Sequence, residues 1–144
     1  VGSPHLERLL QQVPETIIIG HGPGFWADIG GSLTPEEKSG YPKGPITKEG
    51  SVPRLFRSYP NLYADISAGS GYNALTRDKA YGVRFLNDFQ DRLLFGTDVC
   101  FGDKEGKAPH LNYLRQLLAN GKISREAFDK ITCRNALRIL KRYT

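Results

Sequence analysis

The sequence predicts an α/β fold built on a parallel sheet. Short apolar runs near residues 16–20, 61–67 and 92–96 are separated by stretches with helical periodicity. Nearly continuous apolar strands are typical of parallel sheets, whose two faces are both covered, and the intervening helices provide the crossovers. A parallel sheet of three strands has two unpaired edges, so we expect further strands from elsewhere or a partner at the edges.

The first predicted element is a helix that ends at Pro14. Ser3 is a suitable N-cap, and Pro4 fits the first helical turn. Apolar side chains then recur at helical spacing and form one face. These are Leu6, Leu9, Leu10 and Val13.

A strand at 16–20 follows, and then a long segment with little periodicity. Residues 21–50 are rich in Gly, Pro, Ser and Lys, and they are far longer than an ordinary connection between a strand and a helix. We therefore expect a lid or binding loop there. A short helix at about 51–58 leads into the second strand, at 61–67.

The second strand is broken by Gly69-Ser70-Gly71, after which one longer helix is expected up to about Phe89. The third strand, 92–96, ends in Thr97-Asp98. Helices at about 109–119, 124–130 and 133–142 complete the chain. Ser124 and Thr132 are the expected caps of the last two.

The composition indicates one globular domain. The chain has 144 residues, of which 39% are hydrophobic and 24% charged, and no apolar run approaches the roughly 20 residues of a membrane span. The first residues have no signal-peptide pattern, and Cys100 and Cys133 suggest neither a disulfide framework nor a zinc knuckle. We therefore expect reduced thiols, a cytoplasmic location and no membrane partner.

The net charge of +5 is concentrated at the end of the chain, where residues 115–144 hold 8 basic and 2 acidic side chains. Arg134, Arg138 and Lys141 lie at helical spacing opposite Ile131, Leu137 and Leu140. This pattern favours the solvated face of an amphipathic helix over a nucleic-acid site.

Polar groups follow each predicted strand, at the edge where parallel α/β folds place their chemistry. His21 follows the first strand, Ser67 and the turn with Ser70 the second, and Asp98 the third. An imidazole and a carboxylate that meet there could bind zinc or another divalent cation, or act as an acid/base pair. Alternatively, the histidine caps a loop and the aspartate caps a helix.

Four segments resemble the last part of the metal-dependent amidohydrolase superfamily, specifically its amidohydrolase-2 type. They are "IIIGHGPGFW", "NLYADISAGSGYN", "RLLFGTDVCFG" and "KITCRNALRIL". In this resemblance His21 matches the histidine after the sixth strand, and Asp98 the aspartate after the eighth. Tyr63, Asp65 and Ser67 match the seventh strand, and Asn135-Ala136 the final helix.

The resemblance implies the C-terminal part of a (β/α)8 TIM barrel, about strands 6–8 with their helices. Residues 1–144 would then be a single partial barrel domain, with 21–50 as a long active-site loop and 124–144 as a C-terminal helical segment. The first strand of the family supplies a His-x-His pair and the fifth another histidine, and neither is found here. We expect at least four site residues upstream, these three histidines among them, and an incomplete site in this chain alone.

The family's activity is implied in the same way. One or two divalent metal ions, zinc foremost, would activate a water that attacks an amide, ester or lactone, and some members decarboxylate instead. Asp98 would be a metal ligand or general base, and His21 a metal ligand or substrate polariser. His5 and His110 follow no strand, so we expect both to be surface or capping residues.

Further side chains near these turns are candidates for contacts with a small-molecule substrate. They are Phe25, Trp26, Ser67, Tyr72, Asn73 and Arg77. Phe25 and Trp26 could equally anchor the long loop, and Arg77 could form a surface ion pair. For Asp65 we expect a structural hydrogen bond. The substrate itself depends on loops 21–50 and 99–108, whose shapes the sequence does not give.

Two other functions stay open from the sequence. Backbone N–H groups at "GHGPG" and "SAGSG" could bind phosphate or another anion without chemistry. The chain could also be an inactive half-barrel that forms a homo-oligomer through its sheet edges.

Overall fold

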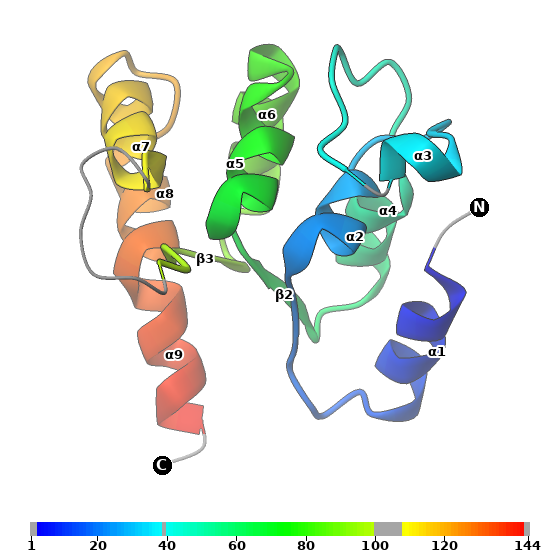
Figure 1. The fold of residues 1–144 in the computed structure, drawn as a ribbon. Coiled ribbons are helices and arrows are strands. Elements are labelled where there is room, and N and C mark those ends of the chain that lie inside the picture. The colour runs from blue at the N-terminus through cyan, green and yellow to red at the C-terminus, as the bar shows by residue number, and fades with distance from the viewer. Residues whose placement is uncertain (1–2, 39, 100–107, 143–144) are drawn as a thin grey trace.

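A computed structural model describes residues 3–38, 40–99 and 108–142, so Cys100 and most of loop 99–108 lie outside the described residues. Within these described residues the chain forms a parallel sheet of three strands in the order β1-β2-β3 (Figure 1). The strands are β1 (Ile18–Gly20), β2 (Leu62–Asp65) and β3 (Leu93–Leu94). The predicted α/β class is confirmed, with strands shorter than expected.

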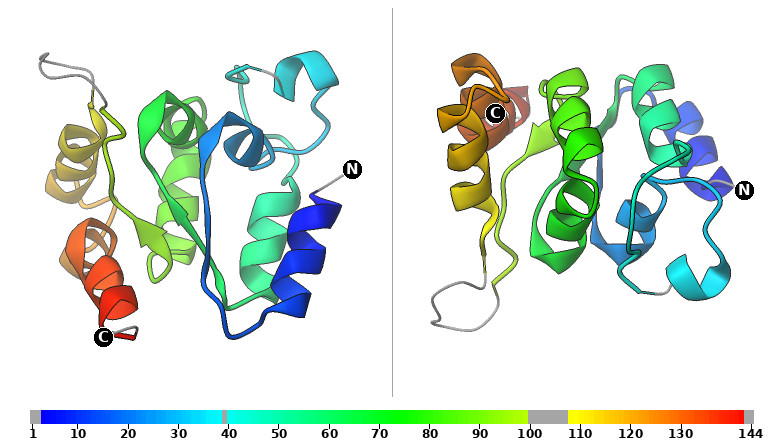
Figure 2. Two further views of the ribbon diagram at one scale, coloured as in Figure 1. Left: turned by 60° about the horizontal axis from the view of Figure 1, so that its bottom comes forward. Right: turned by 90° about the horizontal axis from the view of Figure 1, so that it is seen from above.

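The two faces of the sheet have different surroundings. Leu62 and Ala64 of β2 are fully buried and pack in the main core with the helices, whereas Tyr63 and Asp65 on the opposite face are partly exposed. Ile19 pairs with Tyr63 and is 47% exposed. In the left view of Figure 2 the strands pass in front of the helices that cover the first face.

The helices before and after β2 match the prediction in part. The helices α1 (Pro4–Gln12) and α4 (Ser51–Ser58) lie close to where they are expected. The single helix expected before Phe89 is instead two, α5 (Ala68–Thr76) and α6 (Lys79–Asp88). Asp78 causes the break, because its side chain accepts a hydrogen bond from the Tyr81 N–H and so starts a new helix.

Residues 21–50 are not a continuous loop, which corrects the prediction. They include α2 (Gly22–Ala27) and the single-turn α3 (Pro35–Lys38). The sequence conceals α2 because it begins with Gly22-Pro23-Gly24, yet proline is well tolerated in the first turn of a helix. Its last residues, Trp26 and Ala27, are buried in the core and hold the helix there.

A buried carboxylate holds this segment to the rest of the chain. Asp28 is 6% exposed and accepts hydrogen bonds from Ser3 Oγ at 3.0 Å, Ser51 Oγ at 3.0 Å and Lys38 Nζ at 2.5 Å. We call these four residues the Asp28 cluster. The hydroxyl of Ser3 is used here, and it makes no side-chain cap on α1, contrary to the prediction.

The C-terminal helices form one nearly continuous rod after α7 (His110–Ala119). They are α8 (Arg125–Asp129), the π-helix η1 (Lys130–Arg134) and α9 (Asn135–Arg142). Ser124 caps α8 as predicted, since its Oγ accepts from the Ala127 N–H at 3.0 Å. The predicted cap at Thr132 is wrong: this residue lies inside η1, and its hydroxyl donates to the Phe128 carbonyl at 2.7 Å.

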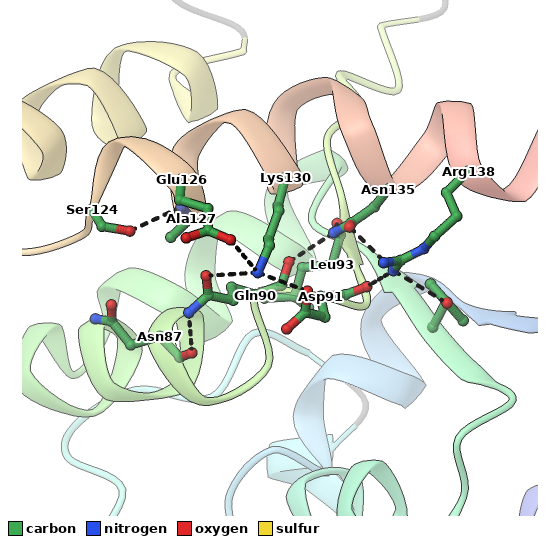
Figure 3. A network of polar contacts seen from close by, with 11 residues as sticks. Asn87, Gln90, Asp91, Leu93, Ser124, Glu126, Ala127, Lys130, Asn135 and Arg138 are labelled. Carbon is green, nitrogen blue, oxygen red and sulfur yellow. Dashed lines mark hydrogen bonds and ion pairs between the residues drawn. The ribbon is translucent and has the colours of Figure 1, made fainter.

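Polar contacts fix this rod to the turn that precedes β3 (Figure 3). Asn135 is 1% exposed, and its Nδ2 donates to the carbonyls of Gln90 at 2.7 Å and Leu93 at 2.9 Å. Lys130 forms an ion pair with Asp91 at 2.9 Å. The asparagine of the "NA" motif therefore has a structural role.

The apolar side of α9 is not buried within the described residues, which corrects the expected amphipathic packing. Leu137 is 49% exposed and Leu140 62% exposed. Figure 1 shows the reason: α9 extends past the short strand β3, so its last turns have no sheet surface beneath them. The basic side chains are solvated as expected, with Arg134 64% exposed.

Candidate active site at the carboxyl ends of the strands

His21 is the first residue after β1 and precedes α2. Its backbone is extended, with φ −149° and ψ 156°, and Gly22 turns the chain with φ +83°, a value that favours glycine. At Gly20 a Cβ would lie 2.3 Å from the Phe25 ring, so a larger residue there would displace that ring. These glycines direct an imidazole that is 46% exposed.

Asp65, the last residue of β2, binds this imidazole from one side. His21 Nδ1 lies 3.0 Å from Asp65 Oδ1 and 3.1 Å from Oδ2. The register explains the contact, because Gly20 pairs with Ala64 and the next residues on both strands are therefore adjacent. The structural hydrogen bond expected for Asp65 is thus made to the candidate catalytic histidine. The sequence contained a signal for this contact, because His21 and Asp65 both lie at the carboxyl ends of predicted neighbouring strands.

Asp98 faces the imidazole from the other side. It follows β3, and its Oδ2 lies 3.7 Å from His21 Nε2, with 44% of its side chain exposed. The backbone of Asp98 has φ +54°, a left-handed conformation that costs a non-glycine residue energy. Backbone strain of this kind is concentrated at functional sites, which adds an independent reason to place the site here.

Ser67 secures the carboxylate of Asp65. Its N–H donates to Asp65 Oδ1 at 3.1 Å, and its hydroxyl donates to the same oxygen at short range. Ser67 is 5% exposed, and its Oγ lies 3.4 Å from His21 Nδ1. Among the predicted substrate-contact residues, Ser67 is therefore the one that bonds to the Asp65 carboxylate and lies beside His21 Nδ1.

These carboxylates change the electrostatics of the imidazole. The hydrogen bond with Asp65 raises the pKa of His21, burial opposes it, and the charges of Asp65 and Asp98 raise it further. The positive form is favoured because an opposite charge close by stabilises it.

Phe25 and Trp26 lie beneath the site. Trp26 is 2% exposed, and its Nε1 donates to the backbone carbonyl of Asp65 at 3.0 Å. The partly buried Phe25 ring fills the space beside Gly20 and contacts Trp26 edge to face. Both positions correspond to the alternative in which these aromatic residues anchor the segment.

Tyr72, Asn73 and Arg77 have partners away from His21. The Tyr72 ring packs against His110 and Tyr113. Asn73 donates to the Pro42 carbonyl at 3.0 Å, and Arg77 donates to that of Gly44 at 3.3 Å. Burial lowers the pKa of Arg77. Asn73 and Arg77 therefore hold the segment between α3 and α4.

His110 is buried and its side chain caps no end of α7, which corrects the prediction of a surface or capping residue. It is 2% exposed, and its Nε2–H donates to the Ala68 carbonyl at 2.8 Å. Ala68 has φ +57°, so His110 helps to hold a strained turn directly after Ser67. Pattern analysis misses this because the contact joins residues 42 positions apart. His5 is exposed, as expected.

The His21 and Asp98 side chains fit two positions of a metal site. Two ligands of a tetrahedral zinc ion lie about 3.3 Å apart when each bond is about 2.0–2.1 Å. The separation of 3.7 Å between His21 Nε2 and Asp98 Oδ2 needs only a small adjustment. In the part of the chain that the structure describes, no group of three or more His, Cys, Asp or Glu is arranged to hold a metal.

Comparison with known proteins identifies the family. The fold and the site are those of a parallel α/β protein with a histidine and an aspartate at the carboxyl edge of its sheet. The amidohydrolase family model matches residues 1–142 of the chain. The chain therefore belongs to the amidohydrolase family, which implies metal-dependent hydrolase activity and a TIM-barrel fold. The family match does not favour the anion-binding alternative. No curated protein and no solved structure matches significantly.

Among the described helices, none is both long and apolar enough to cross a membrane.

Proposed function

We propose that this chain carries the His21 and Asp98 part of a metal-dependent hydrolase site that acts on a small amide, ester or lactone. The observation that carries the proposal is the approach of His21 Nε2 to Asp98 Oδ2, at 3.7 Å, beyond the carboxyl ends of parallel strands. Parallel α/β enzymes place their reacting groups at this edge.

The metal, when bound, supplies a Lewis acid that lowers the pKa of water to about 7. Asp98 is half exposed and has a second carboxylate oxygen, so it can bind the ion and accept a proton from the attacking water. His21 offers Nε2, either as a second ligand or as a group that polarises the substrate carbonyl.

The remaining ligands come from outside these 144 residues in this proposal. A catalytic zinc ion has three protein ligands as a rule, and this site offers two. We therefore propose that the sheet β1-β2-β3 corresponds to strands 6–8 of a TIM barrel. The half-exposed Ile19 would then face the interior of the barrel.

The test is the substitution Asp98→Asn in the intact protein. We expect hydrolysis of a panel of esters, lactones and amides to fall by at least about 10²-fold, because a general base alone contributes that much. The fold is expected to be unchanged, since the Asp98 side chain is 44% exposed. The matched control is Asp91→Asn, which removes an exposed carboxylate paired with Lys130.

Metal dependence is measured in the same assay. Dialysis against a chelator should abolish hydrolysis and added Zn²⁺ should restore it. Full activity of the Asp98→Asn protein would contradict the proposal. Carbon dioxide release from carboxylated aromatic acids, without hydrolysis of the panel, would replace the hydrolase by a decarboxylase that uses the same centre.

A further inference from the structure

The Asp65 side chain lies on the open face of the sheet, yet it contacts both His21 and Ser67. This side chain is 22% exposed and approaches His21 Nδ1 through both oxygens, at 3.0 and 3.1 Å. A carboxylate only accepts hydrogen bonds, so in the neutral imidazole Nδ1 must carry the proton in this contact. The other nitrogen, Nε2, is then a bare acceptor.

The carboxylate itself is held on two sides. Both donors of Ser67, its N–H and its hydroxyl, are directed to Oδ1. On the main chain, Trp26 donates from Nε1 to the Asp65 carbonyl at 3.0 Å, and Trp26 is fixed in the core at 2% exposure. The position of Asp65 therefore does not depend on His21.

We propose that Asp65 is a positioning residue that holds neutral His21 in the Nδ1–H tautomer, so that the Nε2 lone pair faces Asp98. The role of this tautomer in metal binding rests on the proposed function, because a metal ion binds the unprotonated nitrogen of an imidazole. Carboxylate partners of this kind orient metal-binding histidines in many proteins.

The substitution Asp65→Asn gives a sharp expectation for the tautomer. Ser67 presents two donors at the position of Oδ1, so the amide oxygen of the variant takes that position. The amide nitrogen then takes the position of Oδ2, which lies 3.1 Å from His21 Nδ1. Because an amide nitrogen only donates, Nδ1–H loses its Oδ2 acceptor and keeps only the oxygen 3.0 Å away, which already accepts both donors of Ser67. Nδ1 is a better acceptor for the new amide N–H, so we expect the ring proton to shift to Nε2.

The experiment is ¹⁵N NMR of the histidine rings in the intact protein without metal, at a pH well above the range in which imidazole protonates. A His21→Gln protein assigns the His21 signals. We expect Nδ1–H in the wild type and Nε2–H in Asp65→Asn. Asp65→Glu restores a carboxylate and is expected to return the signals toward the wild-type pattern. Asp91→Asn is the control and should leave them unchanged.

The outcomes separate this inference from the proposed function. The inference about Asp65 is overturned if His21 of the wild type is in the Nε2–H form, a result that does not depend on any variant folding. It is also overturned if the tautomer is unchanged in a folded Asp65→Asn protein. As a consequence for function, Asp65→Asn should weaken Zn²⁺ binding by about 10–100-fold. Hydrolysis that is insensitive to chelators would remove the metal-dependent function and leave the tautomer result intact.

Discussion

The Asp28 cluster and the His21 site use similar side chains in opposite ways. Asp28 is 6% exposed, and donors from Ser3, Lys38 and Ser51 surround it. At the other site, the side chains of His21 and Asp98 are 46% and 44% exposed and lie 3.7 Å apart. A buried carboxylate that already accepts three hydrogen bonds is shielded from a ligand, whereas a half-exposed pair has polar atoms directed at the same space.

The pKa values follow the same contrast. Burial on its own would raise the pKa of Asp28, but the hydrogen bonds from Lys38, Ser51 and Ser3 outweigh it and hold the pKa below its ordinary value of 3.8. The negative form of Asp28 is therefore part of the folded state. At the His21 site, the hydrogen bond with Asp65 instead raises the pKa of a group that is open to solvent.

The largest expected effect comes from His21→Ala. We expect Zn²⁺ affinity in the intact protein to fall by more than about 100-fold, the upper end for a change in a partner of a ligand, because a ligand itself is lost. Isothermal titration calorimetry measures this affinity. The melting temperature should stay within a few degrees of the wild type, since the ring is 46% exposed. A large loss of stability with unchanged Zn²⁺ affinity would show that His21 has a structural role and is not a metal ligand.

Asp28→Ala should do the reverse. Removing a buried carboxylate leaves Lys38 and two hydroxyls without their acceptor, and we expect a loss of about 2–3 kcal/mol in the free energy of unfolding. This is below the usual range for a buried ion pair because Lys38 is 32% exposed and can turn to water. Urea unfolding measures the change. Zn²⁺ affinity in the folded protein should match that of the wild type.

The same carboxylate predicts a pH dependence. The folded-state pKa of Asp28 is lowered, so its stabilising contribution is complete above the pKa of the unfolded state, which is the ordinary value of 3.8. It is lost as the pH falls below that value and through the lower folded pKa. The difference in unfolding free energy between the wild type and Asp28→Asn should therefore shrink over this acid range. A difference that is constant with pH would show that the charge of Asp28 has no part in stability.

The smallest effect is expected from Ser51→Ala, which removes one hydrogen bond of the Asp28 cluster and leaves the other two in place. Ser51 is 8% exposed and donates one of the hydrogen bonds to Asp28, so its removal should cost about 1–2 kcal/mol. Ser67→Ala is the matched change at the open site. It should alter the NMR signals of His21, whereas Ser51→Ala should leave them as in the wild type.

Local sequence alone determined the order of the three strands and the place of several helices, and it selected part of the candidate site. Apolar runs and helical periodicity correctly indicated three strands and the helix at 51–58. The rule that chemistry follows parallel strands selected His21 and Asp98, and the structure brings these two within 3.7 Å. Such features depend on neighbouring residues and on backbone preference, so a linear pattern contains them.

Tertiary structure decided which side chains meet and which are covered. The Asp65–His21 contact depends on the register of β1 and β2, and the burial of His110 depends on its contact with Ala68. Likewise, Leu140 fits an amphipathic pattern yet is 62% exposed, because α9 extends beyond β3. Periodicity states which side of an element is apolar, but burial and pairing are set by contacts between residues far apart in the chain.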